Sequence, residues 1–355
     1  MMRALELAAR GLYSAHPNPM VGCVIANDER VVGEGWHERA GEPHAEINAL
    51  AAAGSDAEGA TAYVTLEPCA HHGKTPPCAE ALIRAGIGKV VAAMQDPSAQ
   101  VAGRGIDMLR NAGVTIEVGL MQTEAEALNA GFIARVTRNR PLLRVKVAAS
   151  IDGATAMKSG ESQWITGPEA RNDVQRLRAR SGAIMTGIGT VLADDPSLNV
   201  RLKELTTAGL QPLRVVLDSR LRMPLSAGML ALPGETLVCC TGKHDHSRLS
   251  GAGAEVRSYA ADGAVIDARA VLLDLARREV NDVLVEAGPG VTGYLLQKEL
   301  VDELVIYQAP HIMGSETRGM FQTPSWLALA DRKRLDVSDV RRIGDDTRIT
   351  ARVQY

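Results

Sequence analysis

Short apolar runs alternate with helix-like segments along nearly the whole chain, and this pattern limits the possible folds more than any other feature. Before residue 140 we expect helices at 2–11, 44–53, 78–86 and 103–112, and strands near 20–26, 31–35, 61–66, 89–93 and 114–118. After residue 141 we expect strands near 142–149, 183–187, 213–218, 236–240, 283–287 and 303–309, and helices near 168–180, 267–278 and 291–299. Such alternation is typical of layered α/β folds.

The length of 355 residues corresponds to about two domains at roughly 150 residues each. The basic segment VTRNRP, Val136 to Pro141, ends in proline, and a strand-like run, LLRVKVAAS, follows it. We therefore expect one domain over residues 1–140 and a second over residues 141–355.

Charge and aromatic content argue against a nucleic-acid partner. The chain has 39 basic and 42 acidic residues, a formal charge of -3, so no overall positive field attracts a polyanion. Aromatic residues make up only 3% of the chain, too few to stack many bases. Any phosphate that this protein binds must be met by local groups.

The sequence also predicts a cytoplasmic protein without a membrane segment. No run approaches the roughly 18 apolar residues of a membrane span, and the amphipathic start MMRALELAARG lacks the apolar core of a signal peptide. The five cysteines are odd in number and unevenly spaced, which suits reduced thiols or a metal better than a disulfide framework.

The most informative residues are His44, Cys69 and Cys78, because one imidazole and two thiolates are zinc ligands that leave a fourth position open. Prolines precede both ligand clusters and place them at the N-termini of predicted helices, where the helix dipole favours thiolate. Glu46 is two residues from His44 and is better placed to move a proton than to bind the metal. This order, H-x-E followed by P-C, is typical of zinc deaminases, which replace a ring amino group with oxygen.

The spacing leaves other interpretations open. Eight residues, AHHGKTPP, separate the two thiols where the general signature has two, so a structural zinc site or a pair of core cysteines is conceivable. His71 and His72, inside this insert, are either competing ligands or surface loop histidines.

Two patterns in the second half suggest phosphate binding. The run Gly288 to Gly293, GPGVTG, follows the strand-like DVLVEA and precedes a helix, although Gln308 stands where a dinucleotide site has an acidic residue and a tight glycine turn is the alternative. A capping box, Thr166 to Glu169, is expected to open a helix with Arg171, Gln175 and Arg178 on one face. That face either grips phosphate or is solvated, and Trp164 just before it either packs in the core or stacks on a flat ring.

Longer runs resemble one family. HPNPMVGCVI, GEGWHERAGEPHAE, TLEPCAHHGKTPPC and QDPSAQVAGRG are similar to the deaminase half of the bifunctional riboflavin-biosynthesis deaminase/reductases, and KVAASIDGATA, SGESQWITG, GIGTVLADDPSLNVR, VVLDS and VEAGPGVTG to its reductase half. The resemblance implies a cytidine-deaminase-like three-layer α/β/α domain followed by a dihydrofolate-reductase-like α/β domain. It also implies that the eight-residue insert is the family's own pattern.

The resemblance implies the following chemistry for the first domain. Zinc-dependent hydrolysis would remove the 2-amino group of 2,5-diamino-6-(5-phosphoribosylamino)pyrimidin-4(3H)-one. One Zn2+ would be held by His44, Cys69 and Cys78, and Glu46 would move the proton. The substrate would be bound by Asn18, His37, His71, Lys74 and Asp96.

The second domain would use NADPH to reduce the ribosyl group of 5-amino-6-(5-phosphoribosylamino)uracil to ribityl. By the resemblance, NADPH would contact Ala148, Trp164, Thr190, Asp194, Ser219, Gly288, Pro289, Gly290, Val291, Thr292, Gly293 and Tyr294. The substrate would contact Ser162, Arg178, Leu198, Arg201 and Glu286. Ala154 stands where many relatives have Lys or Arg, which puts one such contact in doubt.

The partners expected are therefore small pyrimidine ribosyl phosphates, with no nucleic acid and no membrane, in a homo-oligomer, a dimer or a tetramer. Two rival hypotheses are a deaminase of nucleic acid guided by the second domain, and a protein without activity whose zinc serves structure. The acidic charge balance argues against the first.

Overall fold

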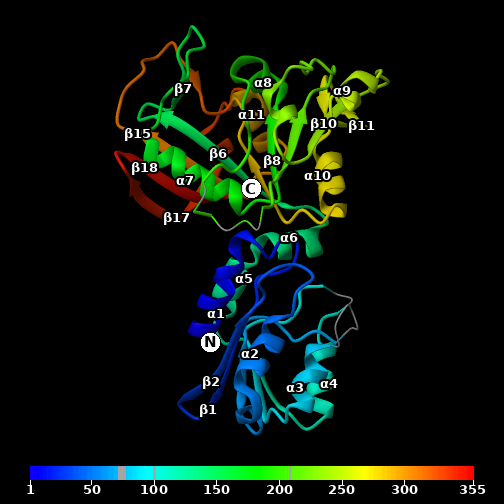
Figure 1. The fold of residues 1–355 in the computed structure, drawn as a ribbon. Helices are drawn as coiled ribbons and strands as arrows, with labels where there is room; N and C mark the ends of the chain where they lie inside the picture. Colours follow the sequence, from blue (N-terminus) through cyan, green and yellow to red (C-terminus); the bar gives the residue numbers. More distant parts are fainter. Residues whose placement is uncertain (71–76, 99–100, 203, 206, 208) are drawn as a thin grey trace. The chain divides into compact units, whose positions relative to one another are not determined.

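The chain divides into two compact units, Met1–Arg140 and Pro141–Tyr355, in the computed structural model (Figure 1). The structure describes residues 1–70, 77–98, 101–202, 204–205, 207 and 209–355. Each unit has its own sheet and its own apolar core. Among the described residues, none of the helices has the length and apolar character needed to cross a bilayer.

The first unit is a sheet with helices on both faces. Its helices and strands are, in chain order, α1 (Met2–Ala9), β1 (Gly22–Asn27), β2 (Arg30–Trp36), α2 (Ala45–Ala53), β3 (Thr61–Val64), α3 (Cys78–Arg84), β4 (Lys89–Ala92), α4 (Arg104–Asn111), β5 (Thr115–Val118), α5 (Gln122–Leu128) and α6 (Ala130–Arg138). Over the described ranges the sheet has five strands in the order β2-β1-β3-β4-β5. Strand β1 is antiparallel to both neighbours, and β3, β4 and β5 are parallel.

Helix α2 lies unusually close to the sheet because two glycines of β2 face it. A Cβ atom on Gly33 would lie 2.2 Å from the Ala49 carbonyl oxygen, and one on Gly35 would lie 2.4 Å from the Ala45 carbonyl oxygen. The helix presents alanines to this surface, and Ala45, Ala49 and Ala53 are buried. This packing of small residues fixes the N-terminus of α2, where His44 and Glu46 stand.

The second unit is larger. Its helices and strands are β6 (Leu142–Ser150), β7 (Ala154–Ala156), α7 (Pro168–Ala179), β8 (Ala183–Gly187), α8 (Ile188–Asp194), β9 (Leu213–Leu217), β10 (Thr236–Thr241), α9 (Ser247–Gly251), β11 (Glu255–Tyr259), β12 (Ala261–Asp262), β13 (Val265–Ile266), α10 (Ala268–Arg277), β14 (Asp282–Val285), α11 (Pro289–Gln297), β15 (Glu303–Ala309), β16 (Arg318–Gly319), β17 (Arg334–Ile343) and β18 (Asp346–Gln354). In the described part, its main sheet has nine strands in the order β11-β10-β9-β8-β14-β6-β15-β18-β17.

Helices cover both faces of the central strands of this sheet. The strands from β11 to β15 are parallel, and β18 and β17 continue the sheet as an antiparallel hairpin. Residues of α10 and α11 pack on one face, and residues of α7, α8 and α9 pack on the other (Figure 1). Parallel strands end at a common edge, so the segments that follow β8, β9 and β14 come together there.

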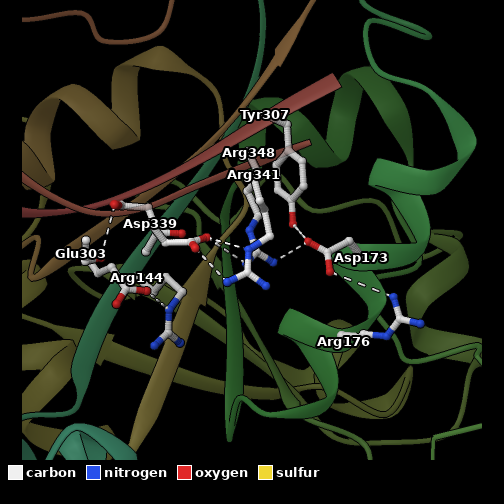
Figure 2. Close-up of polar contacts among 10 residues, drawn as sticks. Arg144, Asp173, Arg176, Glu303, Tyr307, Asp339, Arg341 and Arg348 are labelled. Atoms are coloured by element: carbon white, nitrogen blue, oxygen red, sulfur yellow. Dashed lines mark hydrogen bonds and ion pairs between the residues drawn. The ribbon is translucent and has the colours of Figure 1, made fainter. Parts of the chain in front are cut away.

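A buried polar cluster fastens α7 to β15 and β18 (Figure 2). The Tyr307 hydroxyl donates to Asp173 Oδ2 at 2.6 Å, and Arg348 Nη1 donates to the same oxygen at 2.7 Å. Arg348 also reaches Asp339 on β17, and Arg341 donates to both oxygens of Asp339 at 2.7 Å. The carboxylate of Asp173 is thus satisfied by a hydroxyl and a guanidinium, which buried charge requires.

The α/β fold class predicted from the sequence is confirmed, and each predicted helix and strand has a counterpart within a few residues. One detail was wrong: helix α7 is capped by Gly167, so Thr166 is not the first residue of a capping box. The basic segment from Val136 begins inside α6, which ends at Arg138, and the division between the two units falls just after it, at Arg140. The hairpin of β17 and β18 was not predicted because charged residues interrupt its apolar pattern.

Replacing Tyr307 by Phe should lower the free energy of unfolding of the second unit by about 1–2 kcal/mol, because Asp173 loses a buried hydrogen bond. Urea unfolding followed by a probe in this unit measures the change. Tyr259 is partly exposed and donates to Asp274, which also pairs with Arg257 and Arg278, so Tyr259→Phe should cost less. Equal costs would contradict the structural importance of the buried cluster.

Candidate active sites

Three potential metal ligands converge in the first unit. His44 precedes the first residue of α2, Cys78 is the first residue of α3, and Cys69 follows β3. His44 Nδ1 lies 3.2 Å from Cys78 Sγ and 3.6 Å from Cys69 Sγ, and all three ligand atoms lie within 4.8 Å of one another. It is the one such group of at least three His, Cys, Asp or Glu ligands found in the described part of the chain.

The electrostatics of this cluster favour a thiolate. Hydrogen bonds from the Cys78 thiol, from His44 and from the Cys78 backbone lower the pKa of Cys69 to about 4. The shared hydrogen bond and burial raise the pKa of Cys78 above its ordinary value, so Cys69 ionises first. One imidazole nitrogen and two sulfurs form a donor set that fits zinc, and three protein ligands leave room for a fourth.

Glu46 stands in the first turn of α2 with only 3% of its surface exposed. Burial raises the pKa of its carboxyl group to about 7, and the negative charge of Cys69 acts in the same direction. A pKa near neutrality allows one group both to accept and to return a proton. Glu46 therefore has the environment that a general acid and base needs.

His37 and Asn18 lie beside the metal cluster. The rings of His37 and His44 are in edge contact, with centroids 5.4 Å apart. His37 Nδ1 lies 3.2 Å from the Pro43 carbonyl oxygen, and Nε2 lies 3.0 Å from Asn18 Nδ2. Because a carbonyl can only accept, Nδ1 carries the proton and Nε2 accepts from the Asn18 amide. Burial lowers the pKa of His37, which favours this neutral form.

Of the remaining predicted substrate residues of this unit, the structure describes only Asp96. Asp96 follows β4, and its Oδ1 accepts from the Ser98 backbone N–H at 2.8 Å. His71 and Lys74 lie outside the described residues. Asn129, which the sequence did not single out, is buried and clamps the segment that carries Asn18. Its side chain bonds both the N–H and the carbonyl of Met20, at 2.8 and 2.9 Å.

The second unit brings cations together around one carboxylate. Arg178 on α7 donates to both oxygens of Glu286, at 2.6 and 3.1 Å. Lys146 on β6 places Nζ 3.3 Å from Glu286 Oε2, a contact that no local sequence pattern indicated. Burial opposes ionisation of Glu286, yet the charges of Arg178 and Lys146 hold its pKa at about 2. Glu286 is therefore an anion flanked by two cations.

Arg201 is the third cation of this group. Its segment is held against α7, because Gln175 accepts from the Arg201 backbone N–H at 2.9 Å and Arg178 Nη1 donates to the Asn199 carbonyl at 3.1 Å. Burial and the charge of Arg178 lower the pKa of Arg201. With one carboxylate among three cations, the group has a net positive charge that suits a phosphate monoester. The face of α7 with Gln175 and Arg178 is thus engaged with this segment, and is not merely solvated.

The predicted cofactor residues lie mostly where parallel strands end. Thr190 and Asp194 belong to α8, which follows β8, and Ser219 follows β9. Ala148 is in β6, and Gly288 caps α11, which follows β14. Trp164 is 71% exposed, and the Arg171 guanidinium lies 4.7 Å from its ring centroid. The structure therefore excludes a core role for Trp164 and leaves its ring available for stacking.

The glycine-rich run divides into two parts. Gly288, Pro289, Gly290 and Val291 form the start of α11, where backbone N–H groups can meet phosphate. Gly293 instead faces the segment at Gln322, because a Cβ there would lie 2.1 Å from the Gln322 carbonyl oxygen. Thr292 donates to the Met320 carbonyl at 2.8 Å. The Tyr294 hydroxyl donates to Asp262 at 2.9 Å, which directs this side chain to the hairpin of β12 and β13.

Three positions of the second unit have side chains with limited access to a ligand. Leu198 is buried in an apolar cluster with α8, so its backbone is what it can offer. Ala154 is buried in β7, and its N–H donates to the Ser150 hydroxyl at 3.0 Å. Ser162, on the segment before α7, is half-buried.

Comparisons with known proteins match both units. A model of the RibD C-terminal domain matches residues 141–349, and a model of the cytidine and deoxycytidylate deaminase zinc-binding region matches residues 1–94. The riboflavin biosynthesis protein RibD of Escherichia coli is 49% identical over 355 residues, which cover 98% of this chain and 96% of that protein. RibD of Haemophilus influenzae is 45% identical over 359 residues, covering 99% of this chain and 95% of that protein.

Solved structures of similar proteins also match this chain over its whole length. Acinetobacter baumannii RibD matches with a TM-score of 0.93 and 45% identity, covering 100% of this chain and 98% of that one. A diaminohydroxyphosphoribosylaminopyrimidine deaminase/5-amino-6-(5-phosphoribosylamino)uracil reductase from Thermotoga maritima matches with a TM-score of 0.87 and 33% identity, covering 100% and 97%. Similarity of this extent over both units shows that the chain belongs to the RibD family of riboflavin biosynthesis proteins.

Proposed function

We propose that this chain is a bifunctional enzyme of riboflavin biosynthesis whose first unit removes the 2-amino group of 2,5-diamino-6-(5-phosphoribosylamino)pyrimidin-4(3H)-one. The observation that carries this assignment is the group of His44, Cys69 and Cys78, whose ligand atoms lie within 4.8 Å of one another next to the buried Glu46. The similarity of the whole chain to RibD supports the assignment of this substrate. Zinc held by these ligands would make water a nucleophile at neutral pH.

Glu46 carries the proton in this reaction. Its carboxylate accepts a proton from the attacking water and returns it to the amino group, which then leaves as ammonia. Asn18 is oriented by His37: its Nδ2 donates to the imidazole, so its Oδ1 can accept a hydrogen bond from the pyrimidine. Asp96, His71 and Lys74 complete the substrate contacts by family resemblance.

The second unit reduces the ribosyl group of 5-amino-6-(5-phosphoribosylamino)uracil to ribityl. NADPH supplies the hydride. The start of α11, α8 and Trp164 hold the cofactor, and Arg178 and Arg201 bind the sugar phosphate with Ser162, Leu198 and Glu286. Lys146 joins this set because it contacts Glu286. The match of residues 141–349 to the RibD C-terminal domain argues against a domain that guides a deaminase to nucleic acid.

Glu46→Gln should lower the rate of ammonia release at least about a hundredfold, because the amide cannot accept the proton. Mass analysis of products, with and without NADPH, measures both half-reactions. Zinc content and reduction of supplied 5-amino-6-(5-phosphoribosylamino)uracil should stay unchanged, whereas Cys78→Ser should also lose zinc. Cys240→Ser, in the other unit, is the control that keeps zinc and ammonia release. Full deamination by Glu46→Gln would support a structural zinc site.

Arg178→Ala should raise the KM for the sugar phosphate about tenfold or more, because a charge-assisted contact to phosphate is lost, and change the KM for NADPH much less. Steady-state reduction with each substrate varied in turn gives both constants. Lys333→Ala, which removes a cation paired with Glu299 away from all predicted contacts, should change neither. Equal increases in both constants would remove Arg178 from the phosphate site.

A homo-oligomer in the cytoplasm is also proposed. Five free cysteines support a reducing compartment. On β17, Leu335, Val337 and Val340 pair with Val353, Ala351 and Ile349, so they share one face of the sheet. All three are exposed, with Val340 at 61%. An edge strand that presents three apolar side chains suits burial against a second copy of the chain.

Val337→Asp should shift the protein towards the 37.7 kDa monomer, because burial of a carboxylate at the contact is unfavourable. Light scattering with size-exclusion chromatography measures the mass. Val31→Asp, an exposed valine in the first unit, should leave the mass of a dimer or tetramer intact. A monomeric unsubstituted protein would contradict the proposal.

A further inference from the structure

Glu67 lies two residues before Cys69, and its carboxylate receives hydrogen bonds from four backbone N–H groups of one distant segment. Oε2 accepts from Asp96 at 3.1 Å and from Gly103 at 3.0 Å, and Oε1 accepts from Gly105 at 2.9 Å and from Ile106 at 3.3 Å. Its own N–H donates to the Met94 carbonyl at 2.9 Å. Only 4% of Glu67 is exposed, so water cannot easily replace these bonds.

This carboxylate caps α4 from outside the helix. The residue before α4 is Gly103, which has a positive φ of 82° and no side chain to satisfy the first turn. Oε1 of Glu67 accepts the N–H groups of Gly105 and Ile106 in that turn, and its negative charge faces the positive end of the helix dipole. The helix therefore depends on Glu67 for the group that its own sequence lacks.

The same contact brings the chain next to the zinc ligand against the start of α4. A Cβ atom on Gly105 would lie 1.8 Å from the Pro68 carbonyl oxygen, so the two backbones touch. Pro68 directly precedes Cys69, and Glu67 Oε2 accepts a hydrogen bond from the backbone N–H of Asp96. One buried carboxylate thus links Cys69 to Asp96 by a path of main-chain contacts.

We propose that Glu67 is a positioning residue of the deaminase site, which fixes the backbone of Asp96 at a set distance from Cys69 so that Asp96 meets the pyrimidine. The proposal rests on the proposed function, which gives Asp96 its contact with substrate. Glu67 does not touch the substrate in this scheme. It acts only through the backbone N–H groups of Asp96, Gly103, Gly105 and Ile106.

Glu67→Gln tests the backbone link directly. The variant keeps the size of the side chain and replaces one acceptor oxygen with an NH2 group that faces two N–H donors. Hydrogen exchange should become about tenfold faster or more at the two amides that the NH2 group faces, either Asp96 and Gly103 or Gly105 and Ile106, since that pair loses its buried acceptor. Exchange on α2, zinc content and reductase activity should stay unchanged. Glu124→Gln, an exposed carboxylate on α5, is the matched control.

Kinetics test the link to substrate. Glu67→Gln should raise the KM for the deaminase substrate about tenfold, equivalent to 1.4 kcal/mol, and lower kcat much less. Asp96→Ala alone should raise the same KM. If Glu67 acts through Asp96, the double variant should be no worse than Asp96→Ala, because the path from Glu67 then ends at a missing group.

The outcomes separate the two proposals. Absence of ammonia release by the unsubstituted protein would overturn the proposed function, and the exchange measurement would still test the link. Unchanged exchange, an unchanged KM, or effects of Glu67→Gln and Asp96→Ala that multiply would each overturn the positioning role. Should Glu67→Gln not fold, Glu67→Asp keeps the charge and shortens the reach, and an unchanged KM in that variant overturns the role as well.

Discussion

Parallel strands end at one edge of a sheet, and both sites of this protein are built on that constraint. In the first unit β3 and β4 are parallel, and Cys69 and Asp96 follow them. In the second unit β8, β9 and β14 are parallel, and α8, Ser219 and Glu286 follow them. Groups that are far apart in sequence become neighbours because their strands are neighbours, and only short segments are needed to aim each side chain.

Each site then depends on a close approach that few residues allow. Gly33 and Gly35 let α2 lie against β2, which sets His44 and Glu46 over the end of the sheet. In the second unit, α7 is held from two sides. Asp173 binds Tyr307 and Arg348 of the sheet, and Arg178 binds Glu286 (Figure 2 shows the first contact). A helix fixed by two buried ion clusters keeps its cation in place without a ligand.

The sequence could predict what is local. The zinc ligands and Glu46 belong to short motifs, and periodicity located most helices and strands. Contacts between distant segments gave no such signal: Lys146 meets Glu286 across 140 positions, and Asn129 reaches back to Met20. The sequence predicted Thr166 as the cap of α7, but Gly167 is the cap. The Gly167 N–H donates to Asp346 of β18, a distant partner that no local pattern could indicate.

The two sites share no described residue, and this separation has a chemical consequence. His44, Cys69, Cys78 and Glu46 lie in Met1–Arg140, whereas Arg178, Glu286 and the start of α11 lie in Pro141–Tyr355, each with its own core. The first reaction needs a buried proton carrier beside a metal, and the second needs cations for a phosphate beside a dinucleotide. The two reactions change different parts of a phosphorylated molecule, the pyrimidine ring in the first and the ribosyl group in the second, so each needs its own arrangement of groups around the reacting atom. Joining two complete units in one chain keeps both activities in equal amounts and gives the intermediate a second site on the same molecule.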